Sequence, residues 1–367
     1  MRFSYYVNPQ PDNNNTRNFI AELLDQVTLA EELGYSDVWL TEHHFTGYNI
    51  YSDPILLAAA ISQKAPSMNI GFSVNVAPLH HPVRFATQIN LLDQLTNGKV
   101  IVGIGPGNST DEYAGFGLDV KNRHEMMAEF MKVVFQAWDA KNEFSYSGKY
   151  YNGKVSGRII PSSIQKPYPR IAIASTTPER LEWIGANGWS ILLGPQNPEI
   201  VASRIKYFFD GMRKAKLPEI AKLNAWQNTG VLRQIYIADK GEDWQNTLSK
   251  EISNYIQRSA MANTGIDALP KEQFDVRKQA YLEGGWLLGG TSEEVFKQLK
   301  PFAQMGLSNL MCWFNFGGMQ NESIKNSMEQ FQKYVAPELK KIKIEKGLIK
   351  KITSKKITLS AGLQNIP

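Results

Sequence analysis

The stretch that decides the fold is residues 69–105, NIGFSVNVAPLHHPVRFATQINLLDQLTNGKVIVGIG. It predicts an apolar strand over Asn69–Val76, a helix over Pro82–Thr96 and a second apolar strand over Lys99–Gly105. Two strands joined by a crossover helix are typical of parallel pairing, because antiparallel neighbours need only a short turn. The stretch therefore predicts one βαβ unit of an α/β fold.

The same alternation continues on both sides of this unit. Apolar side chains spaced three and four residues apart indicate helices, and short apolar runs between them indicate strands. The predicted strands cover residues 2–8, 36–42, 69–76, 99–105, 170–175, 189–193, 231–238 and 308–314. The predicted helices cover residues 19–33, 54–65, 82–96, 123–138, 178–187, 198–213, 242–262 and 292–305. Eight strands predict a (β/α)8 TIM barrel, because a doubly wound sheet rarely needs so many.

Three segments lie outside this alternation. Residues 144–161, FSYSGKYYNGKVSGRIIP, predict a β-hairpin with glycine turns. Asn263–Gly285 has no clear period and predicts a long insertion before the last strand, with Gly284 and Gly285 as the hinge of a lid. Residues 340–356 carry eight lysines and one glutamate, so subtracting their +7 from the chain's formal +5 leaves −2 elsewhere. We therefore expect a barrel domain over residues 1–337 and a basic C-terminal tail over residues 338–367, either solvated or facing phosphate or a membrane surface.

The composition excludes several classes of protein. With 43% hydrophobic and 20% charged residues the chain is globular and not mainly disordered. The single cysteine, Cys312, excludes an internal disulfide framework and a cysteine-based zinc cluster. No apolar run resembles a secretory signal or a membrane span. The expected location is cytoplasmic, with neither nucleic acid nor membrane as partner.

The sharpest motif is Glu42-His43-His44, at the end of the second predicted strand. Reacting residues of a (β/α)8 barrel lie at the carboxyl ends of strands, and a carboxylate with two imidazoles transfers protons near neutral pH. Neighbouring side chains of an extended chain point to opposite sides, so only one histidine is expected to face the pocket. Metal binding and a structural role stay open. His80 and His81 precede Pro82 and are interpreted as capping or packing residues.

Two further motifs follow strands. Gly105-Pro106-Gly107-Asn108 is not a dinucleotide fingerprint, but its glycines allow close backbone approach to a flat ligand. Ser175-Thr176-Thr177 precedes Pro178 at a predicted helix start, where an N-terminus binds anions such as phosphate or is simply capped. Arg123 begins a long helix and is either a phosphate donor or a solvated arginine.

Taken together, the motifs resemble the bacterial luciferase-like flavin-dependent monooxygenase family. The resemblance covers about residues 1–337 and is carried by LTEHHF (40–45), GFSVNVAPLHHPVR (71–84), LLDQLTNGKVIVGIGPG (91–107), YSGKYYN (146–152), PSSIQKPYPRIAIAST (161–176) and GTSEEVFKQLKPFAQMGLSNLMCWFNFGGM (290–319). It implies a (β/α)8 barrel that binds FMN or, in a sister branch, the deazaflavin F420.

Residue by residue, the resemblance also implies roles. His43 matches a catalytic base near the flavin and Glu42 the acid beside it, and Ser73-Val74 matches a pair joined by a non-proline cis peptide that props the flavin ring. Gly105 stands where the luciferase has a reactive cysteine, and Gly107 and Asn108 match a loop that meets the flavin through its backbone. The matched phosphate contacts are Arg123, Ser175, Thr176 and Thr177. Pro106 replaces an arginine that clamps the phosphate in many relatives, a departure that would weaken FMN binding.

The function implied is a two-component monooxygenase. It would take reduced FMN (FMNH2) from a separate NAD(P)H:flavin reductase and oxygenate a small apolar substrate with O2 through a C4a-(hydro)peroxyflavin, as a homodimer without a metal. The alternatives are F420-dependent hydride transfer, a non-catalytic flavin-binding homologue, and a metal-dependent barrel hydrolase using His43 and His44.

Overall fold

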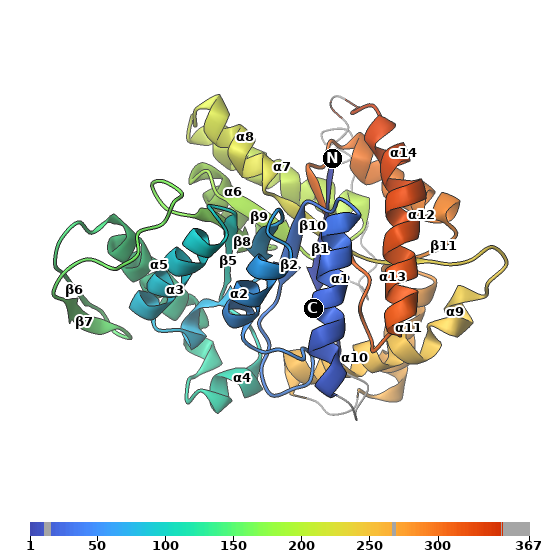
Figure 1. Ribbon diagram of the computed structural model, residues 1–367, viewed down its shortest axis with the longest axis horizontal. Helices are drawn as coiled ribbons and strands as arrows, with labels where there is room; N and C mark the ends of the chain where they lie inside the picture. The colour runs from blue at the N-terminus through green and yellow to red at the C-terminus, as the bar shows by residue number, and fades with distance from the viewer. Residues whose placement is uncertain (11–15, 266–268, 346, 348–367) are drawn as a thin grey trace. The chain divides into compact units, whose positions relative to one another are not determined.

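The computed structural model describes residues 1–10, 16–265, 269–345 and 347 (Figure 1). The chain divides into two compact units. The N-terminal unit comprises Tyr5–Ala174 with Gln257–Ala268, and the C-terminal unit comprises Met1–Ser4, Ser175–Ile256 and Leu269–Pro367.

Parallel strands form the centre of the N-terminal unit. They are β1 (Arg2–Val7, whose first residues belong to the other unit), β2 (Asp37–Leu40), β3 (Asn69–Phe72), β4 (Asn75–Val76), β5 (Val100–Gly105) and β8 (Arg170–Ala174). The order is β1-β2-β3-β5-β8, and β4 also pairs with β5. Trp39 of β2 lies opposite Gly71 of β3, and a Cβ at Gly71 would come within 2.4 Å of the Trp39 ring. Gly71 therefore leaves the space that the indole fills.

Helices connect these strands and cover them. They are α1 (Thr16–Glu32), α2 (Pro54–Lys64), η1 (Ala77–Leu79), α3 (Pro82–Leu95), α4 (Thr110–Gly115), η2 (Val120–Asn122) and α5 (Arg123–Asp139). The antiparallel hairpin of β6 (Phe144–Ser147) and β7 (Asn152–Val155) follows α5 (Figure 1). The Glu129 carboxylate of α5 accepts hydrogen bonds from the backbone amides of Lys149, Tyr150 and Tyr151, which anchors the hairpin turn on the helix.

The C-terminal unit has the same construction. Its strands are β9 (Ser190–Leu193), β10 (Gly230–Ile237), β11 (Leu287–Gly290) and β12 (Asn309–Trp313), and β10 pairs in parallel with the other three. Its helices are α6 (Pro178–Ala186), α7 (Pro198–Lys214), α8 (Glu219–Gln227), α9 (Trp244–Thr247), α10 (Ser249–Thr264, which enters the N-terminal unit at Gln257), α11 (Lys271–Leu282), α12 (Ser292–Gln304), α13 (Asn321–Gln330), η3 (Phe331–Val335) and α14 (Ala336–Lys341).

Parallel strands alternating with helices confirm the predicted (β/α)8 fold class, and the hairpin lies where it was predicted. Strand β5 is an unbroken apolar run because its side chains are buried on both faces, and all six of its residues are buried. None of the described helices combines the length and the apolar character that crossing a bilayer requires.

Several boundaries differ from the predictions. The strand predicted over Asn69–Val76 is interrupted at Ser73-Val74, so it forms β3 and β4. The insertion predicted over Asn263–Gly285 contains α11 and is followed by β11, whose sequence LLGG is too short and glycine-rich to signal a strand. The helix predicted over Glu242–Ala262 is two helices, α9 and α10. Of the predicted tail, residue 346 and residues 348–367 lie outside the described part of the chain.

Candidate active site

The predicted motif Glu42-His43-His44 follows directly on β2 and lies among side chains from two other segments of the N-terminal unit. His80 comes from the turn before α3, and Glu112 comes from α4. Two carboxylates and three imidazoles therefore meet near the carboxyl ends of β2, β4 and β5. The sequence alone identified three of these five residues, Glu42, His43 and His44, as a candidate site.

Glu42 binds two histidines. Its buried carboxylate contacts His44 Nε2 through Oε1 at 3.0 Å, while Oε2 contacts His80 Nε2 at 2.8 Å and accepts a hydrogen bond from the backbone amide of Val76 at 2.7 Å. Burial by itself raises the pKa of Glu42, but the charge of His80 and the hydrogen bonds outweigh it, so the pKa falls from 4.5 to about 2. For His80, burial lowers the pKa, but attraction to Glu42 is stronger and the net pKa lies above 6.5.

His43 has a different carboxylate partner. Its Nδ1 lies 3.2 Å from Glu112 Oε1, and the same oxygen accepts a hydrogen bond from the backbone amide of His44 at 3.0 Å. The Tyr48 ring meets the imidazole edge-on at 4.7 Å, and the His43 side chain is 25% exposed. The described contacts therefore pair His43 with Glu112, whereas Glu42 pairs with His44 and His80. Neighbouring side chains leave the chain in different directions, so Glu42 and His43 cannot readily face each other.

The position of Glu112 has a local cause. Helix α4 is capped by Ser109, whose hydroxyl accepts a hydrogen bond from the backbone amide of Glu112 at 3.3 Å. Ser109-Thr110-Asp111-Glu112 has the S-x-x-E spacing of a capping box, a signal in the sequence that marks the start of this helix. In a closed capping box the glutamate turns back to the cap residue, whereas the Glu112 carboxylate binds His43 and the His44 amide instead.

Beside these side chains the backbone forms a narrow cradle. The Ser73–Val74 peptide is cis, as the family resemblance implies. A Cβ at Gly105 would lie 2.6 Å from Val74 Cγ2, and one at Gly107 would lie 2.7 Å from Val76 Cγ1. Gly107 also has a φ of +63°, which other residues rarely adopt. Both glycines therefore leave the space that the Val74 and Val76 side chains fill, and Gly105 leaves no room for the side chain of a cysteine.

Two buried polar groups of the N-terminal unit have no hydrogen-bond partner among the residues that the structure describes. Asn75 is fully buried and donates from Nδ2 to the Gly103 carbonyl at 3.3 Å, but its Oδ1 meets no polar atom of the described residues. The buried Nε1 of Trp39 on β2 likewise has no hydrogen-bond partner among the described residues. Buried polar atoms are normally hydrogen-bonded. The polar edge of a flat ring, such as the isoalloxazine of a flavin, fits these unsatisfied donors and acceptors.

The remaining predicted site residues lie in three other segments of the chain. Asn108 donates from Nδ2 to Asn263 Oδ1 at 3.1 Å, which ties the loop after β5 to the end of α10. Arg123 begins α5 and donates from Nη1 to the Val120 carbonyl at 3.1 Å. Ser175, Thr176 and Thr177 belong to the C-terminal unit and lead into α6. Thr177 is the N-cap of α6 but makes no side-chain capping bond, so simple capping does not account for its hydroxyl.

The sequence profile of the luciferase-like monooxygenases matches residues 1–309 of the chain. The chain belongs to this family. A relative of this luciferase-like monooxygenase is the oxygenase component of the flavin-dependent trigonelline monooxygenase of Acinetobacter baylyi, 23% identical over 94% of this chain and 98% of the relative.

Solved structures show the same fold. The monooxygenase RslO1 of Streptomyces bottropensis superposes with a TM-score of 0.78 at 21% identity, over 92% of this chain and 99% of RslO1. The oxygenating constituent of 3,6-diketocamphane monooxygenase of Pseudomonas putida, solved with FMN, gives 0.73 at 17% identity, over 94% and 99%. An F420-dependent secondary alcohol dehydrogenase gives 0.70 at 14% identity, over 91% and 98%.

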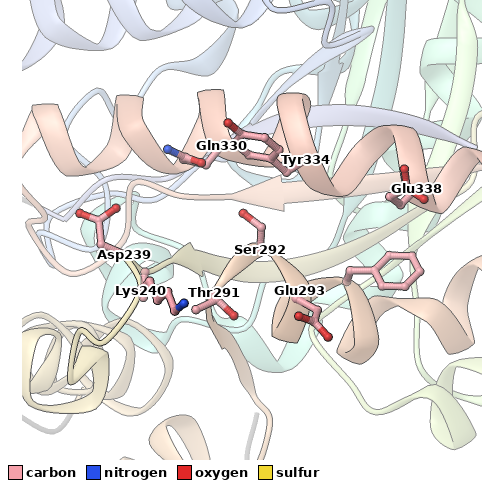
Figure 2. A pocket seen from close by; sticks show the side chains of 10 residues that line it. Asp239, Lys240, Thr291, Ser292, Glu293, Gln330, Tyr334 and Glu338 are labelled. Atoms are coloured by element: carbon pink, nitrogen blue, oxygen red, sulfur yellow. The ribbon is translucent and has the colours of Figure 1, made fainter.

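Two other features of the chain were compared with the site. Among residues 1–10, 16–265, 269–345 and 347, no three His, Cys, Asp or Glu side chains are arranged to hold a metal ion. A pocket of about 670 Å³ lies in the C-terminal unit, between the loop after β10, the start of α12 and the segment from α13 to α14 (Figure 2). None of the predicted site residues lines this pocket.

Proposed function

We propose that this luciferase-like monooxygenase is the oxygenase component of a two-component system. It would take reduced FMN from a separate NAD(P)H:flavin reductase, and the bound cofactor would supply the electrons with which O2 oxygenates a small apolar organic substrate. The observation that carries the proposal is the partly exposed His43 held by the buried Glu112 carboxylate, in the same unit as the unsatisfied buried amide of Asn75.

His43 is the proposed catalytic base. The Glu112 carboxylate is an acceptor and therefore favours the tautomer of His43 with the proton on Nδ1. The lone pair of Nε2 is then available to take a proton from a bound reactant. Glu42 has an indirect role in this proposal, because its carboxylate positions the His44 and His80 rings and binds the backbone amide of Val76.

Arg123 of the N-terminal unit and Ser175, Thr176 and Thr177 of the C-terminal unit are each proposed as phosphate contacts. The amino end of α6 offers backbone N–H groups and a favourable dipole, and the Thr177 hydroxyl is not used as a cap. A guanidinium from Arg123 would add charged hydrogen bonds to a phosphate oxygen. These four residues would compensate for the arginine that Pro106 replaces.

A homodimer is also proposed, through α2 and α3. The side chains of Leu56 on α2 and of Leu91 and Leu95 on α3 are 72%, 51% and 45% exposed, while Phe85 and Ile89 of α3 are buried in the core. Helix α3 thus presents one apolar face inward and leaves a second one in water, which favours contact with another copy.

An anaerobic titration with FMNH2 followed by a pulse of O2 tests the proposed function. We expect FMNH2 to bind more tightly than reduced F420, and the flavin to reoxidise more slowly on the protein than in free solution. NADH consumption should require an added flavin reductase. Preferential binding of F420, or NADH oxidation by the purified chain with FMN alone, would contradict the proposal.

A further inference from the structure

Gln234 on β10 is a buried polar side chain without a partner. The residue has no exposed surface, and neither Oε1 nor Nε2 of its amide meets a hydrogen-bonding atom of the described residues. Gln234 lies in register with Trp313 of β12 and Leu287 of β11, in the middle of the strand layer of the C-terminal unit.

The neighbouring residue Arg233 shows which face Gln234 occupies. The Arg233 guanidinium donates to the carbonyls of Gln196, Gly285 and Trp286, and it lies 5.7 Å from the centre of the Phe302 ring of α12. Arg233 therefore points toward α12 and the loops beside it. Successive side chains of a strand alternate, so Gln234 points to the opposite face of β10.

Trp313 of β12 lies on that opposite face. Trp313 shares the register position of Gln234, and its ring meets that of Tyr255 edge-on at 5.3 Å. Tyr281 in turn packs against Tyr255 at 5.2 Å, and its hydroxyl contacts the Tyr255 hydroxyl at 3.3 Å. Gln234 thus offers two donor hydrogens and one acceptor beside Trp313, a combination suited to a planar molecule with a polar edge.

An unpartnered amide in such a place is unfavourable for the free protein. A buried donor or acceptor that has given up its water without a new hydrogen bond destabilises the fold, whereas an apolar side chain of similar shape does not. The sequence nevertheless has Gln234 here, between Leu232 and Tyr236, which are buried residues of the same strand face. We therefore expect the side-chain amide of Gln234 to form its hydrogen bonds when a ligand is bound.

We propose that Gln234 is a ligand-recognition residue whose side-chain amide pairs with an amide-type edge, a carbonyl oxygen beside an N–H, on a planar bound molecule. Two molecules have this chemistry: the pyrimidine ring of a flavin, in which case the inference rests on the proposed function, and an organic substrate with a lactam or amide group. Two hydrogen bonds of this kind account for about a tenfold to hundredfold change in affinity.

The test compares Gln234→Met with Gln298→Met. Gln298 is a glutamine of the same unit whose Nε2 donates to the Gly289 carbonyl at 2.9 Å, so its amide is already used. In the ligand-free protein, Gln234→Met should raise the midpoint of urea unfolding, because it removes an unpaired buried amide. Gln298→Met should lower the midpoint or leave it unchanged. A lower midpoint for Gln234→Met would show that the amide is satisfied in the free protein and would overturn the inference.

Binding then separates the two sources. FMN, 3-methyl-FMN (whose ring N–H is blocked) and the lactam 2-pyridone are titrated into wild type and both variants. If the flavin is the partner, Gln234→Met weakens FMN at least tenfold, and methylation weakens FMN only in wild type and Gln298→Met. If a substrate is the partner, FMN is unaffected and 2-pyridone binding is lost only in Gln234→Met. Unchanged binding of all three probes would overturn the inference. Failure of wild type to bind any flavin would sink the proposed function alone, since the urea and 2-pyridone measurements still decide the role of Gln234.

Discussion

Replacing Glu42 by glutamine keeps the size of the side chain and removes its charge. In the wild-type chain the carboxylate is 2% exposed and holds His44, His80 and the amide of Val76. Glu42→Gln leaves His80 buried without its counter-charge, so the variant should be less stable at neutral pH, and its His80 should give up its proton at a lower pH than in wild type.

The pKa of Glu42 sets the size of the effect. A tenfold change in proton affinity is worth about 1.4 kcal/mol, so a pKa lowered from 4.5 to about 2 corresponds to about 3 kcal/mol of stability above pH 4.5. This agrees with the cost of breaking a buried ion pair by removing one partner, about 3–5 kcal/mol. We therefore expect the free energy of unfolding at pH 7 to fall by about 3 kcal/mol.

The pH dependence of this loss has a definite sign. Because the pKa of Glu42 is lowered in the folded state, its stabilisation is present above pH 4.5 and is lost as the pH falls toward 2. Because the pKa of His80 is raised, its stabilisation is complete below pH 6.5 and is lost as the pH rises through the folded-state pKa. The difference between wild type and Glu42→Gln should therefore shrink at both ends of the pH range.

Urea unfolding between pH 3 and 9, together with an NMR titration of the His80 ring, measures both effects. The control is Glu125→Gln, because the Glu125 carboxylate is exposed and bonds only Lys149 and Tyr150 at the surface. The control should unfold like wild type at every pH. The reasoning fails if Glu42→Gln is as stable as wild type at pH 7, or if the His80 titration does not move.

Three further outcomes are expected. His43→Ala should lower turnover by about 10²–10⁴-fold with FMNH2 affinity kept within a few-fold, while His44→Ala should impair folding or flavin-ring packing; the reverse pattern in steady-state kinetics would exchange their roles. Arg123→Ala should weaken FMNH2 more than reduced riboflavin in anaerobic titrations, and equal losses would exclude a phosphate contact. Light scattering should give a dimer mass at micromolar concentration and a monomer mass for Leu91→Asp with Leu95→Asp, and a wild-type monomer would contradict the interface.

The fold was predictable from the sequence where local and tertiary preferences agree. Strands buried on both faces, such as β5, are mainly apolar, and helices such as Arg123–Asp139 keep a regular apolar face, so both are visible as patterns. Short elements were missed, because their identity depends on neighbours distant in the chain. Strand β11 exists because Leu287–Gly290 aligns with Gln234–Ile237 of β10, a pairing that four residues with two glycines do not announce.

The sequence predicted the central motif of the candidate site but not which carboxylate pairs with which histidine. A comparison of two helix starts shows why. In α12, Thr291 and Glu294 form a complete capping box: the Glu294 carboxylate accepts hydrogen bonds from the Thr291 amide and hydroxyl at 2.8 and 2.9 Å. In α4, the Ser109 hydroxyl accepts a hydrogen bond from the Glu112 amide, just as the Thr291 hydroxyl accepts one from the Glu294 amide in α12.

The Glu112 carboxylate departs from this rule. It leaves its own helix start and binds His43 together with the amide of His44, more than sixty residues earlier in the chain. Both glutamates follow the same spacing, so nothing local in the sequence distinguishes them; the histidines that β2 delivers beside α4 make the difference. The Glu112 carboxylate therefore stabilises another segment instead of the start of its own helix. Such departures from local structural preference concentrate at functional sites. This departure is a further reason to place the chemistry of the chain at His43.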